Sequence, residues 1–91
     1  LNAMALVIDA PDLQENVNDL TVSSAAGTLI PYTKNFTSIK NIQATLQTNA
    51  LSSAVTVEVD KTTPLAPTVK CFDVSHTAVS GASVDFVLKG Y

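Results

Sequence analysis

Upstream of Gly27 the hydrophobic positions do not alternate with polar ones. Leu13, Val17 and Leu20 stand at i, i+4 and i+7, which is the spacing of one face of a helix. This spacing favours one short helix in the N-terminal part. An extended stem is the alternative, because the asparagine and aspartate residues between these positions are weak helix formers and residues 21–24 favour a strand.

Downstream of Gly27 the pattern changes to a period of two, which predicts strands. Ile42, Ala44 and Leu46 alternate with polar side chains, so residues 38–47 predict a strand with one buried face. The other expected strands cover residues 28–32, 55–60, 68–74 and 84–89.

Three of these segments carry a further expectation about their place in the fold. Pro31 has no N–H to give to a neighbouring strand, so the strand at residues 28–32 belongs at a sheet edge. In residues 68–74 Val69 and Cys71 point one way while Phe72 and Val74 point the other, so this strand is a candidate for burial on both faces. In the last strand Val84, Phe86 and Leu88 share one face.

The connections between the strands predict how they pair. Residues 49–53 are small and polar, so they are expected to close a hairpin between the strands at 38–47 and 55–60. Residues 61–67 contain two prolines and are expected to cross between sheets. With no helix between the strands, the pattern predicts an all-β fold, an antiparallel β-sandwich of about six strands.

The chain is expected to divide into three parts. Residues 1–4 resemble a cloning remnant before a start methionine, residues 5–27 form a helical or extended stem, and residues 28–91 form the sandwich domain. With 91 residues the chain has room for a single small core. A core this small is usually stabilised further by a disulfide, a metal or a partner subunit. Cys71 is the only cysteine, so it cannot form an intrachain disulfide. We therefore expect a homo-oligomer.

The charge of the chain narrows the class of partner. Charged residues make up 14% of the chain, the net charge is −3, and all the basic residues are lysines. Binding to a nucleic acid requires clustered basic residues, so no nucleic acid partner is expected. No apolar stretch approaches the roughly 20 residues that span a bilayer, so no membrane insertion is expected.

No catalytic, cofactor or metal site is expected, and the chain is not expected to be an enzyme. Cys71 and His76 are the only thiol and imidazole, and five extended residues separate them by roughly 16 Å, too far for a nucleophile and its base. One cysteine and one histidine also fall short of a four-ligand zinc site. Glu58 and Asp60 share a strand face, which is typical of a solvated sheet surface.

Uncharged polar side chains dominate the remaining surface, and they suit contact with a protein or with sugar hydroxyls. Loops on a rigid sandwich commonly carry recognition. The two expected loops at residues 49–53 and 75–81 therefore supply the candidate receptor contacts, which are Asn49, Ser52, Ser53, Ser75, His76 and Thr77.

Three stretches carry a resemblance to a known family. They are FTSI followed by IQATL at residues 36–46, VTVEV at residues 55–59, and VDFVLKGY at residues 84–91, which ends in Gly90-Tyr91. Over residues 28–91 the chain resembles the small β-sandwich domains that end phage and prophage tail fibres and host-specificity proteins, some of which share the H-type lectin architecture.

The resemblance implies a six-stranded antiparallel sandwich that assembles as a homotrimer in the virion tail. It implies a non-enzymatic tail-tip domain that binds a bacterial cell-surface protein or glycan. The alternative function is a structural domain that trimerises and caps a tail fibre without contacting a receptor. The chain lacks the Trp and Arg that lectin members place around a sugar, so no sugar-binding residue follows from the resemblance.

Overall fold

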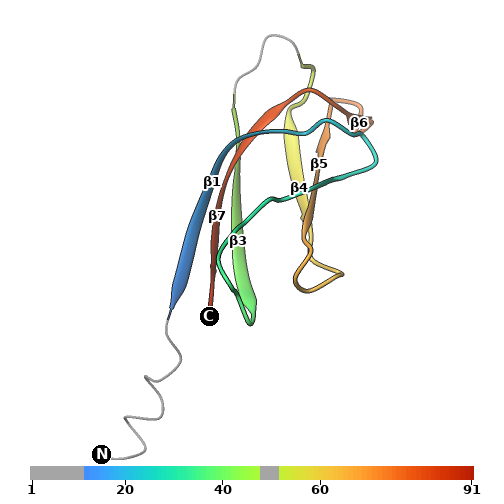
Figure 1. Cartoon of the computed structure of the whole chain (residues 1–91). Helices are drawn as coiled ribbons and strands as arrows, with labels where there is room; N and C mark the ends of the chain where they lie inside the picture. The colour runs from blue at the N-terminus through green and yellow to red at the C-terminus, as the bar shows by residue number, and fades with distance from the viewer. Residues whose placement is uncertain (1–11, 48–51) are drawn as a thin grey trace, which may run out of the picture.

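The structure is a computed structural model of the chain, and it describes residues 12–47 and 52–91. Its regular elements are all strands (Figure 1), which confirms the all-β prediction. In chain order they are β1 (Leu13–Thr21), β2 (Thr28–Leu29), β3 (Ile39–Leu46), β4 (Thr56–Asp60), β5 (Thr68–Phe72), β6 (Ala78–Val79) and β7 (Ser83–Gly90).

The strands form two antiparallel sheets that pack together, as a β-sandwich requires. The first sheet has the order β1-β7-β3. The second has the order β2-β5-β4, with β6 also paired to β5. The short β2 lies at the end of this order and stops two residues before Pro31, so the predicted edge position is confirmed.

The core gathers around the central strand of the first sheet. Val84, Phe86 and Leu88 of β7 are all buried, as the alternating pattern predicts. Ala44 and Ile42 of β3 stand directly beside Phe86 and Leu88 on the same face, and both pack against this core. In β3 and β7 the period of two therefore identifies the side chains that face inward.

Strand β5 occupies the matching place in the second sheet. Val69 and Cys71 are fully buried, while Phe72 is half-buried on the opposite face and Val74 lies beyond the end of the strand. Burial on both faces was therefore the wrong interpretation. Only the Val69 and Cys71 face enters the core.

The helix expected around Leu13, Val17 and Leu20 is wrong, because these residues lie in strand β1, paired along β7. A β-bulge between Val17 and Leu20 explains the misleading spacing. One extra residue in β1 reverses the alternation, so that all three side chains pack against the core although their numbers are not all of one parity. Asp19, in the bulge, has a left-handed backbone with φ of 59°.

The sandwich therefore includes residues on both sides of the expected boundary at Thr28. β1 forms one edge of the first sheet, and Val22, just after it, is fully buried. The extended alternative for this part of the chain is the correct one, in the form of a paired strand. The expected cloning remnant at residues 1–4 and the start of the expected stem lie outside the described residues.

Two connections between strands were wrongly predicted, because the one expected to close a hairpin crosses between the sheets and the one expected to cross joins neighbouring strands. The segment between β3 and β4 crosses from the first sheet to the second, so these strands do not form the expected hairpin. Residues 61–67, expected to cross between sheets, instead join β4 to β5, which pair directly as neighbours. The reason is that β7, from the far end of the chain, pairs with β3 in place of β4.

Candidate functional site

The two loops predicted to carry recognition lie at the same end of the sandwich. Residues 52–55 lead into β4 and residues 73–77 follow β5, and these strand ends are paired, with Thr56 opposite Phe72. The N–H of Val55 donates to the carbonyl of Phe72 at 2.8 Å, which joins the segment before β4 to the end of β5. Ser52 is half-buried and Ser53 exposed. Asn49 lies outside the described residues.

The turn between β5 and β6 is fixed by Asp73. Its Oδ1 accepts hydrogen bonds from the N–H groups of Ser75 and Thr77, each at 2.9 Å. The N–H of His76 donates to the Asp73 carbonyl at 3.0 Å, and His76 adopts the left-handed conformation with φ of 61°. These bonds hold one turn shape while Ser75, His76 and Thr77 remain exposed.

The His76 side chain packs against Phe72 and lies near Glu58. Its ring stacks on the Phe72 ring with centroids 4.4 Å apart and planes 9° apart. Its Nε2 lies 3.9 Å from Oε2 of Glu58 on β4, an exposed pair that contributes little energy. The imidazole therefore has a preferred position over the outer face of the second sheet.

That outer face carries a shallow groove of about 310 Å³. It is lined by Glu58, Val59, Asp60, Lys61, Lys70 and Phe72. Glu58 and Asp60 are exposed, as the prediction of a solvated sheet surface requires. Hydrogen bonds from the side chain and the N–H of Thr62 lower the pKa of Asp60. The Asp60 carboxylate therefore bonds to the loop that follows β4.

Cys71 and His76 are not brought together. Cys71 is 0% exposed and faces the core, and burial raises the pKa of its thiol. His76 stacks on Phe72, whose side chain points from the opposite face of the same strand. The Cys71 thiol and the His76 imidazole therefore lie on opposite faces of the second sheet.

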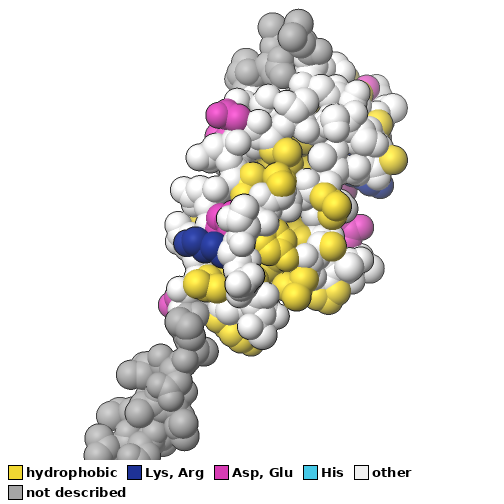
Figure 2. All heavy atoms as spheres, in the orientation of Figure 1, with side chains coloured by type: hydrophobic (Ala, Val, Ile, Leu, Met, Phe, Trp, Pro, Cys, Tyr) yellow, Lys and Arg dark blue, Asp and Glu magenta, His cyan; other side chains and the backbone are white. Residues whose placement is uncertain are grey.

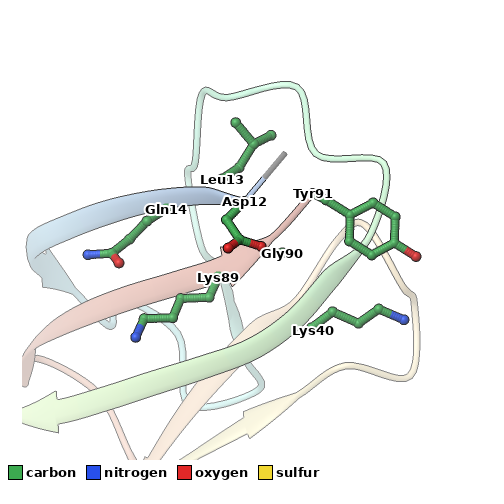
Figure 3. Close-up of a pocket in the computed structure, with 7 residues that line it drawn as sticks. All are labelled: Asp12, Leu13, Gln14, Lys40, Lys89, Gly90 and Tyr91. Atoms are coloured by element: carbon green, nitrogen blue, oxygen red, sulfur yellow. The ribbon is translucent and has the colours of Figure 1, made fainter. Parts of the chain in front are cut away.

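A second groove, of about 350 Å³, lies on the first sheet, at the end of the sandwich away from the turn at residues 73–77 (Figure 1). The sequence did not predict this groove. Its lining residues are Asp12, Leu13, Gln14, Lys40, Lys89, Gly90 and Tyr91 (Figure 3). In this view Tyr91 and Lys40 stand on one side, Asp12 lies at the centre, and the Leu13 side chain points away.

Strand pairing assembles this groove from three distant segments. Gln14 of β1 stands opposite Lys89 of β7, and Asn41 of β3 stands opposite Lys89 from the other side. A register shift in β3 between Ile39 and Asn41 includes Lys40. The Lys40 Nζ lies 5.4 Å from the centroid of the Tyr91 ring, a distance that allows a cation–π interaction.

The backbone of Tyr91 is fixed by the segment before β3. Its carbonyl accepts hydrogen bonds from the N–H groups of Thr37 and Ser38, and its own N–H donates to the Ser38 carbonyl at 3.0 Å. These bonds extend the sheet beyond β7 and place the Tyr91 ring beside Lys40. In the sequence, the only signal was a lysine and a tyrosine on either side of Gly90.

Within residues 12–47 and 52–91, no group of three histidine, cysteine or acidic side chains is placed to hold a metal ion. The same part of the chain contains no helix with the length and apolarity of a membrane span. No protein-family model, curated protein or solved structure matches the chain.

Proposed function

We propose that this chain is a non-enzymatic domain at the tip of a phage tail that binds a bacterial surface receptor, a protein or a glycan. It would be made in the host cytoplasm and carried in the virion tail. The strand ending in Gly90-Tyr91 and its resemblance to tail-fibre domains support the phage context. The observation that carries the binding role is the turn at residues 73–77.

The backbone of this turn is fixed by hydrogen bonds, and two of its side chains are highly exposed. Val74 is 85% exposed, and the side chain of His76 is 71% exposed. Asp73 and the Phe72 ring hold the turn in one shape before any partner arrives. A surface that is already ordered loses less conformational entropy on binding, and this favours recognition by the turn.

Binding of the full chain to bacterial envelope preparations tests the proposal. His76→Asn keeps a residue that tolerates the left-handed backbone but removes the ring, and Val74→Ser removes the apolar tip. We expect each variant to weaken binding by about tenfold, which is about 1.4 kcal/mol. Leu29→Ser, at an exposed hydrophobic position on β2, is the matched control and should bind normally.

Equal binding by all the variants would remove the turn from the receptor contact. No binding of the wild-type chain to any envelope preparation would contradict the receptor role itself. Thermal melts of each variant identify a loss of binding that results only from unfolding.

A structural trimerisation and capping domain is the second candidate, and incomplete burial of the core favours it. Hydrophobic side chains reach the surface on one face of the molecule (Figure 2). Side chains that pack on the core yet remain only partly buried include Ile42, Ala44, Leu46, Val57 and Val59 of β3 and β4. Covering them in a homotrimer would enlarge a small core.

Light scattering coupled to size-exclusion chromatography tests this second candidate. A homotrimer at tens of micromolar would have three times the 9.5 kDa mass of one chain, and Val57→Lys should reduce it to a monomer. A monomeric wild-type chain would contradict trimerisation by these residues and leave the receptor role of the turn intact.

A further inference from the structure

We infer that the outer face of the first sheet binds a neutral polysaccharide chain, which lies along the strands as an extended ribbon. In this arrangement the sugar rings pack over β7, and their hydroxyls bond to amide side chains on β1 and β3. The turn at residues 73–77, the proposed receptor contact, follows β5 of the second sheet. The inference therefore concerns another surface and does not depend on that contact.

The outer face carries two columns of amide side chains, one on each side of β7. The four amides are Gln14 and Asn16 of β1 and Asn41 and Gln43 of β3. One pair stands on either side of Val87, the other on either side of Lys89, and all four are exposed. Figure 3 shows Gln14 and Lys89 extending in the same direction from the sheet. Because neighbouring strands lie about 4.8 Å apart, the columns are about 10 Å apart, and the amides within a column repeat about every 7 Å.

These amides have unused hydrogen-bonding groups. In the described part of the chain, none of the four side chains forms a hydrogen bond. Each amide offers two N–H donors and a carbonyl acceptor. An apolar protein surface would bury these groups without partners, which costs free energy for every group. A hydroxyl donates and accepts, so a ligand with many hydroxyls satisfies them and is favoured over a protein partner.

The middle of this face carries no charged side chain. In the row through Val87, both neighbours are amides, and the charged side chains of β7 stand one row away on either side, Asp85 and Lys89. Oδ1 of Asp85 already accepts hydrogen bonds from the N–H of Asp19 and from the Gln47 amide. Uncharged polar groups cost less to desolvate than charged groups do. The ligand that complements this face is therefore neutral.

The arrangement of the two columns favours an extended ligand. A polysaccharide of the cellulose type is a flat ribbon whose rings have C–H groups above and below and hydroxyls at both edges. A ring over the half-buried Val87 places its C–H groups on an apolar side chain and its edge hydroxyls toward the amides on either side. A coiled polysaccharide does not present hydroxyls along two parallel edges. Groups carried by a sheet also hold their spacing better than groups carried by loops.

The test is a chemical-shift titration of the full chain, labelled with nitrogen-15, with cellohexaose, a neutral and extended chain of glucose units. We expect shifts confined to the three strands of the first sheet, and an affinity that does not change as sodium chloride is raised. Asn16→Ala and Gln43→Ala should each weaken binding by about three- to tenfold, as the loss of one hydrogen-bonding amide implies.

Asn35→Ala is the matched control and should bind as the wild type does. Asn35 is an exposed amide in the loop that bonds to Glu15, whose side chain alternates with Gln14 and Asn16 and so lies on the other face of β1. His76→Asn, in the turn at residues 73–77, should also leave the affinity for cellohexaose unchanged. Failure of this surface is therefore distinguishable from failure of the proposed receptor contact.

A second sugar makes the result decisive. Maltohexaose has the same glucose units but coils, so it should bind at least about tenfold more weakly. Absence of shifts with cellohexaose, shifts away from the first sheet, equal binding of the two sugars, or unchanged affinity in both amide variants would each overturn the inference. Shifts of the same residues that depend on protein concentration without sugar would place a second copy on this face, and would overturn it too.

Discussion

Gly90 allows β7 and the segment before β3 to approach each other closely. A Cβ atom built at position 90 would lie within 3.0 Å of backbone atoms of Ser38 and Ile39. Backbone atoms cannot move aside as the end of a side chain can. The absence of a side chain at Gly90 is therefore what lets Tyr91 bond to Ser38 and complete the groove.

We expect Gly90→Ala to lower the free energy of unfolding by about 2–3 kcal/mol, because the added methyl group overpacks the junction. Urea unfolding followed by circular dichroism measures this change. Lys89→Ala, at the exposed neighbouring position, should change stability by no more than about 0.5 kcal/mol. Equal stability of both variants would show that the junction tolerates the extra carbon.

Glu15 joins β1 to the loop at residues 33–34. Its carboxylate accepts hydrogen bonds from the N–H of Lys34 at 2.7 Å, from the N–H of Thr33 at 2.8 Å and from the Thr33 hydroxyl at 3.1 Å. Desolvation by itself raises the pKa of Glu15, but these hydrogen bonds and the Lys34 charge outweigh it and lower the pKa below 4.5.

A lowered pKa in the folded chain means that the carboxylate stabilises the fold fully above the unfolded pKa, near 4.5, and loses this effect as the pH falls through the lower folded value. We expect Glu15→Gln to cost about 1 kcal/mol at pH 7 and less at pH 3. Urea unfolding at both pH values measures the difference, and an equal cost at both would contradict the assigned role of the charge.

At the scale of the elements, the bulge in β1 decides which side chains of that strand reach the core. The N–H of Asp19 donates to Oδ1 of Asp85 at 2.8 Å, and the Gln47 amide donates to the side chains of Asp19 and Asp85. These bonds attach the bulge to β7 and to the end of β3. They allow Val17 before the bulge and Leu20 after it to face inward together.

We expect Val17→Asp to destabilise the fold by about 2–4 kcal/mol, because it places a carboxylate among apolar side chains without a partner. Asn16→Asp, one residue earlier on the exposed face, should cost no more than about 0.5 kcal/mol. Thermal and urea unfolding compare the two. A helix with Val17 facing solvent would give equal effects, so the pair also tests the strand assignment.

At the scale of the whole molecule, Cys71 reports on the integrity of the sandwich. Its side chain is fully buried between the sheets, and burial raises the pKa of its thiol. A thiol reagent reacts with the thiolate, so it requires the sandwich to open. We expect labelling to be slower than that of a free thiol by at least about 10³-fold.

The labelling rate should rise with urea in step with unfolding. Val17→Asp should accelerate it, whereas Asn16→Asp should leave it unchanged. Rapid labelling in the absence of urea, with the circular dichroism signal intact, would place Cys71 outside a closed core.

Predictability from the sequence differed sharply between elements. The strands containing Ile42 and Phe86 were predicted because strict alternation needs only local information. Strand β1 was missed because its bulge shifts the alternation and imitates helical spacing. The turn around His76 was placed correctly as an exposed loop. The groove around Lys40 and Lys89 was missed, since these residues meet only through strand pairing across the sheet.

The alternation of apolar and polar residues by itself determined that the chain forms strands and which faces of β3 and β7 are buried, because burial of one face depends on neighbours two positions away. Which strands pair was decided only by the tertiary structure. β7 pairs with both β1 and β3, and a pairing between distant segments depends on the packing of the whole core. The same long-range pairing decided where Lys40, Lys89 and Tyr91 meet, so no local pattern could reveal that site.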